Sequence, residues 1–464
     1  MTTEFSGALA PRGSTAVVLG DSPGCATVLG TLIAVGVEVE EEARGTAPDI
    51  CVAVLTGSSV LGSRSRGGLP RQRLAAIADR MAERGTGRMV LVTDAGGGVH
   101  TGADPSEAAD RAADLAWWRH LAARSASRGV VANQIRVGLA PFLSHELEPV
   151  RTGSVLQHLP LRRVARPGDL ACALVQLIST GCAYTVGETL PLDGGLTLNL
   201  IPPLREPKPW TPPREPEAAL ADRFSLAGRT ALVIGASSGI GAESAAELAR
   251  RGADVVLVAR REPELRAVAE RIGGRPVVAD VRDTEAILDS VDGIDLLVYA
   301  AGVFGLDGAA ETRARSMEVN FRAYAEICDA LVDRWRESGT RGSIVGVCSV
   351  GAEVVPVQRM ESYGASKAAM VQYTRCLAVS AGRDGIRANC VAPGIVDTPM
   401  SEWVAPAFRD AWTARIPLGS VGTPPDVASF VAFLASDAAS HVTGSLVHVD
   451  GGFTLGGLPP LGEQ

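Results

Sequence analysis

The sequence predicts an α/β protein in which a doubly wound parallel sheet occurs twice. In the second half, short apolar runs alternate with amphipathic segments, as expected where helices connect parallel strands. A proline-rich stretch divides the chain into two parts, and both parts carry similar short motifs in the same order. We therefore expect a tandem duplication of one α/β domain.

The bulk composition restricts the class of protein. A chain of 464 residues predicts two or three domains at roughly 100–200 residues each. Its hydrophobic content of 46% and charged content of 21% are typical of a globular protein. A formal charge of -8 argues against a nucleic-acid partner. No apolar run is long enough for a membrane span, and the N-terminus does not resemble a signal peptide.

The cysteines and lysines are informative about location and chemistry. The eight cysteines are scattered without a CxxC pair, which argues against a metal site and a disulfide framework and predicts a cytoplasmic protein. Only Lys208 and Lys367 are lysine, and all other basic residues are arginine. A lysine retained in such a chain is a candidate for a position that requires an ammonium group, although chance is the alternative.

The proline-rich stretch Ile201–Asp222 holds seven prolines and is expected to be an extended linker. It predicts a first domain at 1–200, a linker at 201–222 and a second domain at 223–464. The matching landmarks are VTGSLVHVDGG (Val442–Gly452) with YTVGETLPLDGG (Tyr184–Gly195), GIRAN (Gly385–Asn389) with GVVAN (Gly129–Asn133), and DLLV (Asp295–Val298) with DICV (Asp49–Val52).

The second domain contains the clearer pattern of strands and helices. Amphipathic segments at Glu243–Arg251 and Ala368–Ala381 predict two of its helices. Ligands bind such sheets in a crevice at the carboxyl ends of the strands. The buried parallel strands are predicted at Thr230–Ile234, Asp254–Val258, Pro276–Val278, Leu296–Tyr299 and Ser343–Val347.

A glycine-rich turn, Gly235-Ala-Ser-Ser-Gly239-Ile-Gly241, follows the first of these strands and precedes a helix. Glycines at these positions let the backbone turn tightly and approach a pyrophosphate at the helix N-terminus. A plain strand-to-helix turn is the alternative. A second strand that ends about 20 residues later is the context of a dinucleotide site and favours the nucleotide interpretation.

The end of the second strand indicates which coenzyme is bound. An acidic residue there would bind the ribose hydroxyls of NAD, but this chain has Arg260 and Arg261. A guanidinium suits a 2′-phosphate, so NADP(H) is expected. The alternative is that both arginines are only solvated.

The glycine-rich turn together with Tyr363-Gly-Ala-Ser-Lys367 resembles the short-chain dehydrogenase/reductase family. The resemblance covers essentially all of residues 224–456 and implies a Rossmann-type fold. Its further landmarks are Asp280-Val281, Ala300-Ala301-Gly302, Asn320, Ser349, Pro393-Gly394 and Thr398.

The chemistry of Tyr363 and Lys367 can also be argued from the residues. Hydride transfer to a ketone leaves an alkoxide that needs a proton, which a tyrosine can donate if its pKa of ~10 is lowered. Lys367 lies four residues after Tyr363, on the same helix face, where its ammonium is expected to stabilise the phenolate. Ser349 can hold the substrate oxygen.

The resemblance implies roles for the other positions. Asn320 would support a proton relay behind Lys367, Asp280 would contact the adenine, and Thr398 would hold the nicotinamide carboxamide. The expected coenzyme-binding set is Gly235, Ser237, Ser238, Gly239, Ile240, Gly241, Arg260, Arg261, Asp280, Val281, Ala300, Ala301, Gly302, Tyr363, Lys367, Pro393, Gly394 and Thr398. Two positions depart from the family: Ile234 replaces a threonine, and residues 299–302 lack the usual asparagine.

The first domain is expected to be catalytically empty. Aligned on GVVAN, Glu107 replaces Tyr363 and Arg111 replaces Lys367, while Asp94 replaces Ser349. The turn Gly20–Ala26 loses the third glycine and inserts a proline and a carboxylate. Only 29 residues separate Gly20 from Asp49, against 60 from Gly235 to Asp295, so one strand–helix unit is expected to be missing.

A structural role remains for that domain. The helix expected at Ala108–Ser125 aligns with the catalytic helix through which family members commonly dimerise, and it contains Trp117 and Trp118. Two tryptophans suit an interface, but one of them packing into the domain's own core is equally supported. An intrachain pseudo-dimer, completed by a second chain as a homodimer, is the expectation.

The substrate is the least determined part. Contacts are expected from Gly351–Ser362 and from a lid after Thr398 that carries Met400, Trp403, Phe408 and Trp412. The chain resembles two-domain 3-oxoacyl-thioester reductases and polyketide-tailoring ketoreductases, which implies a ketone substrate, free or carrier-bound. A dehydrogenase or epimerase on the same scaffold and a nucleotide-binding scaffold without turnover are the alternatives.

Overall fold

A computed structural model describes residues 14–20, 24–40, 47–55, 70–94, 105–143, 156, 159–198, 219–305, 309–355, 360–402 and 406–456. It divides into two compact units. The first unit comprises Met1–Ala221 with Ala411–Ser420 and Gly451–Gln464, and the second comprises Asp222–Asp410 with Val421–Asp450. Two segments from the C-terminal part of the chain therefore pack with the N-terminal half.

Tyr184 accounts for part of that assignment. Its hydroxyl donates a hydrogen bond to the carbonyl of Ser420 at 3.0 Å, and its own carbonyl accepts one from the N–H of Gly451 at 2.8 Å. Leu418 and Leu455 pack against the hydrophobic core of the first unit.

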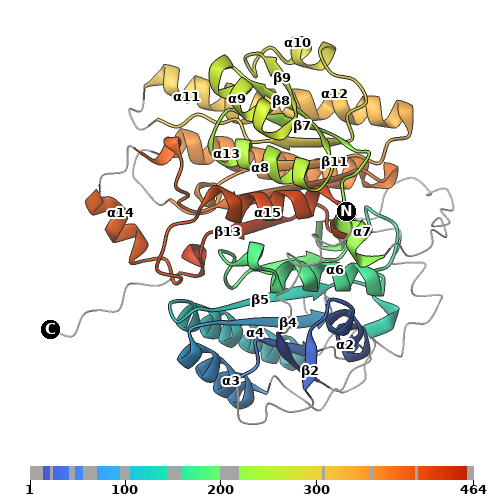
Figure 1. Ribbon diagram of the computed structural model, residues 1–464, viewed down its shortest axis with the longest axis vertical. Helices are drawn as coiled ribbons and strands as arrows, with labels where there is room; N and C mark the ends of the chain where they lie inside the picture. Colours follow the sequence, from blue (N-terminus) through green and yellow to red (C-terminus); the bar gives the residue numbers. More distant parts are fainter. Residues whose placement is uncertain are drawn as a thin grey trace. The chain divides into compact units, whose positions relative to one another are not determined.

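The first unit is a six-stranded parallel sheet in the order β2-β1-β3-β4-β5-β6. Helices α2 and α6 pack together, as do α3 and α4 (Figure 1). The strands are β1 (Thr15–Leu19), β2 (Glu38–Glu40), β3 (Ile50–Leu55), β4 (Gly87–Asp94), β5 (Val130–Val137) and β6 (Thr189–Leu192), and the helices are α2 (Gly24–Ala34), α3 (Arg71–Arg84), α4 (Pro105–Ala126) and α6 (Pro167–Ile178).

The second unit is a seven-stranded parallel sheet in the order β13-β12-β11-β10-β7-β8-β9. Helix α8 packs against both α9 and α15, and α12 packs against both α10 and α13 (Figure 1). The strands are β7 (Thr230–Ile234), β8 (Asp254–Ala259), β9 (Arg275–Val278), β10 (Leu296–Tyr299), β11 (Ser343–Val347), β12 (Arg387–Pro393) and β13 (Leu446–Val449). The helices are α8 (Gly239–Arg250), α9 (Glu262–Ile272), α10 (Thr284–Asp289), α11 (Ala310–Met317), α12 (Ala323–Ser338), α13 (Glu361–Ala381) and α15 (Pro424–Ala435), with α7 (Leu220–Phe224) and α14 (Pro406–Thr413) at the unit boundaries.

The predicted fold class, two doubly wound parallel sheets in tandem, is confirmed by this topology. The five predicted strands all form, and β7, β10 and β11 have the predicted bounds. Every residue of β11 and β12 is buried, which is typical of parallel strands covered by helices on both faces.

Helix bounds were harder to predict. The helix predicted at Ala368–Ala381 begins seven residues earlier, at Glu361. This start was not predicted because the first two turns of α13 consist of small and polar residues without an apolar period. Most of the proline-rich stretch lies outside the described residues. Its last three residues, Leu220–Asp222, are not extended as expected but begin the short helix α7.

The two units repeat the same hydrogen bonds at equivalent positions. The side chain of Asn133 bonds Thr185 O at 2.7 Å and Glu188 N at 3.0 Å. The side chain of Asn389 bonds Val442 O and Ser445 N, both at 3.0 Å. Asp49 and Asp295 likewise accept from the N–H that starts the neighbouring strand, at 2.8 and 2.9 Å. In the described residues of the first sheet, β9 has no counterpart, as the shorter spacing predicted.

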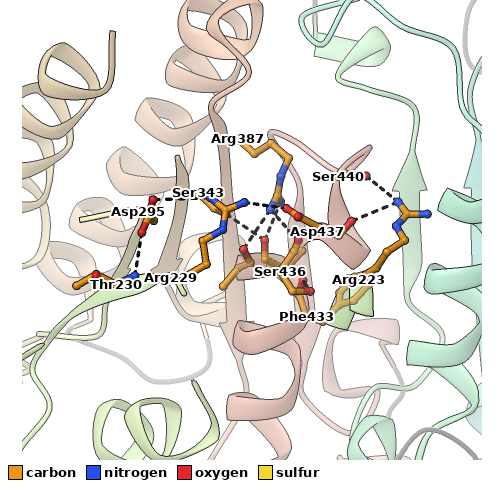
Figure 2. Close-up of polar contacts among 12 residues, drawn as sticks. Arg223, Arg229, Thr230, Asp295, Ser343, Arg387, Phe433, Ser436, Asp437 and Ser440 are labelled. Atoms are coloured by element: carbon orange, nitrogen blue, oxygen red, sulfur yellow. Dashed lines mark hydrogen bonds and ion pairs between the residues drawn. The ribbon is translucent and has the colours of Figure 1, made fainter. Parts of the chain in front are cut away.

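A polar network lies at the amino ends of the second sheet (Figure 2). The buried guanidinium of Arg387 donates to the carbonyls of Leu434, Ala435 and Ser436 at 2.7, 3.3 and 2.9 Å, which satisfies the last carbonyls of α15. This end of the sheet is opposite the carboxyl ends, where the candidate site lies.

Candidate active site

The glycine-rich turn links β7 to α8. The backbone conformation and the close contacts at its three glycines differ from one position to the next. Gly235 has φ 86°, and a Cβ there would lie 2.6 Å from the backbone nitrogen of Ala301. Gly239 has φ 57° and begins α8. A Cβ on Gly241 would lie 2.3 Å from Gly235 O. The turn is therefore closed to any side chain at 235 and 241, and it offers the N-terminus of α8 to an anion.

Ser237 and Ser238 connect this turn to the end of β8. The guanidinium of Arg261 donates to their hydroxyls at 3.0 and 2.5 Å. Arg260 is more exposed and lies 3.7 Å from the carboxylate of Asp280. Of the two cations expected to meet a 2′-phosphate, Arg261 thus lies beside the glycine-rich turn and Arg260 lies near Asp280. Ile240 is the second residue of α8.

Asp280 and Val281 follow β9. The Asp280 carboxylate accepts two hydrogen bonds from the side chain of Arg282, at 3.0 and 2.9 Å. Arg282 chiefly, with Arg260 adding a smaller effect, lowers the pKa of Asp280 to about 2. Arg282 was not among the residues predicted from the sequence, although its place two residues after Asp280 could have suggested this contact.

The loop after β10 carries Ala300, Ala301 and Gly302. The N–H of Ala300 donates to Ile234 O at 2.8 Å, which joins this loop to the turn after β7. A Cβ built on Gly302 would lie 3.6 Å from Asn320 Oδ1 and 3.7 Å from Lys367 Nζ. The side chains of Asn320 and Lys367 therefore both lie beside Gly302.

Tyr363 and Lys367 lie in the first two turns of α13. Lys367 is 3% exposed, and its ammonium donates to Val347 O at 2.8 Å. Its Nζ atom lies 5.9 Å from the centroid of the Tyr363 ring. Burial lowers the pKa of Lys367.

Ser349 follows β11 and faces Tyr363. Burial raises the pKa of Tyr363 to about 12, and a hydrogen bond with the Ser349 hydroxyl offsets this in part. The expected lowering of the tyrosine pKa by Lys367 is therefore wrong for this structure, because the ammonium is turned to Val347 and desolvation dominates. The Ser349 hydroxyl also accepts from the N–H of Gly351 at 3.1 Å.

Asn320 is fully buried in a π-helical turn, η6 (Glu318–Arg322), between α11 and α12. Its Oδ1 accepts from Val303 N at 2.8 Å, and its Nδ2 donates to Val303 O and to the Ser366 hydroxyl, both at 3.0 Å. All of these bonds fix the amide behind Lys367. Single-turn π-helical insertions are frequently found at functional sites.

Pro393 ends β12, Gly394 directly follows the strand, and Thr398 lies four residues further on. A Cβ on Gly394 would lie 2.9 Å from the Cβ of Asp450, so the chain turns closely there. The Thr398 methyl would lie 3.2 Å from a Cβ on Gly239. The segment expected to hold the nicotinamide thus lies against the start of α8.

The substrate-facing segments are described only in part. Val355 and Met400 are exposed apolar side chains, 80% and 47% accessible. Phe304, which was not among the residues predicted from the sequence, packs edge-on against Tyr363 with ring centroids 5.2 Å apart. Trp403 and the Phe408 side chain lie outside the described residues, and Trp412 is half-buried in the first unit.

In the first unit, Asp94 ends β4 at the position of Ser349, and the side chains of Glu107 and Arg111 lie outside the described residues. Trp118 is 1% exposed in the unit's own core, with Trp117 packed against that core. The prediction that one of the two tryptophans packs into the domain's own core is therefore confirmed for Trp118.

Among the described residues, no three metal-binding side chains cluster, and no helix is long and apolar enough to cross a membrane.

Comparisons with known proteins add independent findings. A family model described as enoyl-(acyl carrier protein) reductase matches residues 72–197 and 235–454, one stretch in each half. A 3beta-hydroxysteroid dehydrogenase 1 from Eggerthella lenta is 35% identical over 249 residues, 50% of this chain and 95% of the relative. A cis-4-hydroxycyclohexanecarboxylate dehydrogenase from Sinomonas cyclohexanicum is 38% identical over 50% of this chain and 98% of the relative.

A longer relative and a solved structure extend the comparison. The uncharacterized short-chain type dehydrogenase/reductase y4vI of Sinorhizobium fredii is 30% identical over 367 residues, 74% of this chain and 65% of the relative. A solved structure, a putative 2-deoxy-d-gluconate 3-dehydrogenase from Agrobacterium tumefaciens with bound NADP, is 33% identical. It covers 50% of this chain and 99% of its own, with a TM-score of 0.48.

Proposed function

The chain belongs to the short-chain dehydrogenase/reductase family, and we propose that it uses NADPH to reduce a ketone to a secondary alcohol. Family membership makes it an oxidoreductase of alcohols and ketones that uses a nicotinamide dinucleotide. The proposal of ketone reduction rests on one observation. Ser349, Tyr363 and Lys367 lie close together at the carboxyl end of the second sheet, beside the glycine-rich turn.

The residues fit a bound dinucleotide. Gly235 and Gly241 leave no room for side chains where the backbone must approach the pyrophosphate. Arg260 and Arg261 provide cations at the end of β8, where a carboxylate would select NAD. These arginines support NADP(H) as the coenzyme. In the proposed complex, Asp280 and Val281 face the adenine and Thr398 faces the nicotinamide.

The mechanism follows from what each side chain can do. When bound, the reduced nicotinamide supplies the hydride that forms the new C–H bond at the carbonyl carbon. Ser349 donates a hydrogen bond to the carbonyl oxygen and holds it beside Tyr363. The Tyr363 hydroxyl gives its proton to that oxygen as the carbonyl π bond breaks, which yields the alcohol and a phenolate. Lys367 returns a proton to the phenolate, and Asn320, whose amide lies behind Lys367, supports this relay.

The substrate class rests on the apolar residues around Tyr363. Phe304 covers the edge of the tyrosine ring, and Met400 and Val355 expose apolar surface. These favour an apolar ketone such as a 3-oxoacyl thioester or a polyketide-like compound. Because two relatives are named for hydroxysteroid and hydroxycyclohexanecarboxylate substrates, cyclic ketones are the second class to test.

We also propose one active site per chain, in a cytoplasmic homodimer that uses the first half for pseudo-dimer packing. The replacement of Ser349, Tyr363 and Lys367 by Asp94, Glu107 and Arg111 supports a non-catalytic first half. Eight free cysteines support a reducing compartment.

The test is NADPH consumption by the full chain with three ketone classes: 3-oxoacyl thioesters, steroid or cyclohexanone-type ketones, and sugars. We expect turnover with the first class and a loss of about 10²–10⁴-fold in Tyr363→Phe. The matched control is Tyr373→Phe on the same helix, whose hydroxyl bonds Asp329 and should not affect turnover. Absence of Tyr363-dependent turnover with every ketone and alcohol would favour a non-catalytic nucleotide-binding scaffold.

A further inference from the structure

The π-helical turn that carries Asn320 leaves one backbone carbonyl without its usual donor. In an uninterrupted α-helix, the N–H of Ala323 would bond the carbonyl of Val319. Here the N–H of Ala323 bonds Glu318 O instead, one residue further back. The carbonyl of Val319, the residue directly before Asn320, must therefore be satisfied in another way, since a buried carbonyl without a donor destabilises the fold.

Tyr299 provides the missing donor. Its hydroxyl donates a hydrogen bond to Val319 O, and the tyrosine is 0% exposed. Tyr299 ends β10 at the centre of the sheet, paired with Ile234 of β7 and Gly346 of β11. Its position is thus fixed by two neighbouring strands, and it connects the rigid sheet to the turn.

The other side of the turn is held from α13. Ser366 accepts from Asn320 Nδ2 at 3.0 Å and donates to Tyr363 O at 2.7 Å. The sheet fixes the backbone before Asn320, and the catalytic helix fixes its side chain. Together these contacts set how close Asn320 Oδ1 lies to Lys367 Nζ, both within 4 Å of a Cβ at Gly302.

We propose that Tyr299 is a positioning residue for the reaction: by bonding Val319 O it holds the π-helical turn that places Asn320 behind Lys367. This inference rests on the proposed function. It also gives a role to one of the two departures from the family pattern, since Tyr299 stands in the 299–302 segment that lacks the usual asparagine. The competing account is that Tyr299 only fills the core, where its ring lies edge-on to Tyr324 at 5.2 Å.

Removing only the hydroxyl separates the two accounts, because Tyr299→Phe keeps the ring. The matched control is Tyr324→Phe, which removes a phenol that bonds Thr374 Oγ1 at 2.7 Å and is equally buried. We expect Tyr299→Phe to lower kcat about tenfold with little change in KM for ketone or NADPH, because a relay is disturbed and not a binding contact. Tyr324→Phe should keep kcat within about twofold of wild type while lowering Tm similarly.

A double-mutant cycle tests whether Tyr299 acts through Asn320. If it does, Tyr299→Phe should cost nothing further in an Asn320→Ala background, whereas independent effects would multiply. Equal losses of kcat in Tyr299→Phe and Tyr324→Phe, or an unchanged kcat in Tyr299→Phe, would overturn the proposal.

Amide hydrogen exchange gives a readout without turnover, and so distinguishes failure of this inference from failure of the proposed function. In the full chain, Tyr299→Phe should speed exchange in the peptide covering residues 318–323 by about tenfold or more, and Tyr324→Phe should not. Unchanged exchange there would refute the role of Tyr299, whatever substrate the enzyme uses.

Discussion

Arg261 bonds the hydroxyls of both Ser237 and Ser238, so that the end of β8 and the glycine-rich turn are held together by one guanidinium. Half of the Arg261 side chain remains exposed, which leaves it donors for a further anion. Preorganisation of this kind lowers the cost of ordering a coenzyme-binding side chain.

Coenzyme preference should therefore depend on Arg261. We expect Arg261→Ala to raise KM for NADPH about 10–100-fold, since charged hydrogen bonds contribute about 1.5–3 kcal/mol, while KM for NADH changes little. Initial rates with both coenzymes measure this. Arg266→Ala removes an exposed arginine paired with Glu262 on α9 and is the control. An equal effect on both coenzymes would mean that Arg261 organises the turn without reading the 2′-phosphate.

The raised pKa of Tyr363 predicts opposite pH dependences for the two directions. Reduction needs the protonated phenol, and a pKa of about 12 keeps it protonated well above neutral pH. Oxidation needs the phenolate, whose fraction grows tenfold per pH unit below the pKa. We expect kcat for reduction to be flat from about pH 6 to 9 and kcat for alcohol oxidation to rise throughout. A fall in the reduction rate centred near pH 7 would show that the proton donor titrates there and that burial does not control it.

Phe304 should affect substrate binding more than chemistry. Its ring lies at 84° to that of Tyr363, an edge-to-face geometry worth about 0.5–1.5 kcal/mol beyond area burial. Phe304→Ala should raise KM for a long-chain 3-oxoacyl thioester about tenfold and leave that for a small ketone within about twofold. If both substrates lose kcat equally, Phe304 orients Tyr363 and does not contact the substrate.

Arg387 is expected to stabilise the second unit without affecting chemistry. Its guanidinium bonds three carbonyls at the end of α15, at the amino ends of the strands (Figure 2). Arg387→Met should lower the free energy of unfolding by about 3 kcal/mol, because buried acceptors lose charged donors. Urea unfolding of the full chain measures this, with the exposed Arg383→Met as control. A loss below about 1 kcal/mol would mean that water replaces the guanidinium.

The sequence predicted the strands of the second unit well because each is a short, continuous apolar run bounded by breakers. Glycine-rich turns and Tyr-xxx-Lys spacing are equally local, so the places of Gly235, Tyr363 and Lys367 were predictable. Contacts that form only through tertiary packing could not be predicted from the sequence. Nothing near Asn320 predicts the phenol of Tyr299, and nothing near Tyr363 predicts that Lys367 turns to Val347 O. The segment 411–420 also could not be assigned to the first unit from its sequence, since the contact with Tyr184 joins residues 236 positions apart.

Binding stoichiometry tests whether only one half is an active site. Gly20, the counterpart of Gly235, keeps a positive φ of 144°, and a Cβ there would lie 2.5 Å from Val54 O, so close packing against β3 is enough to require this glycine. Gly241 has no side chain, which lets α8 approach Gly235, but its counterpart in the first half is Ala26. The described part of the first sheet also has no counterpart of β9, the strand beside which an adenosine would bind. Calorimetric titration of the full chain should give one NADPH per chain. Arg261→Ala should weaken that single event by about 10–100-fold, and a second event that survives this substitution would show that the first half binds nucleotide.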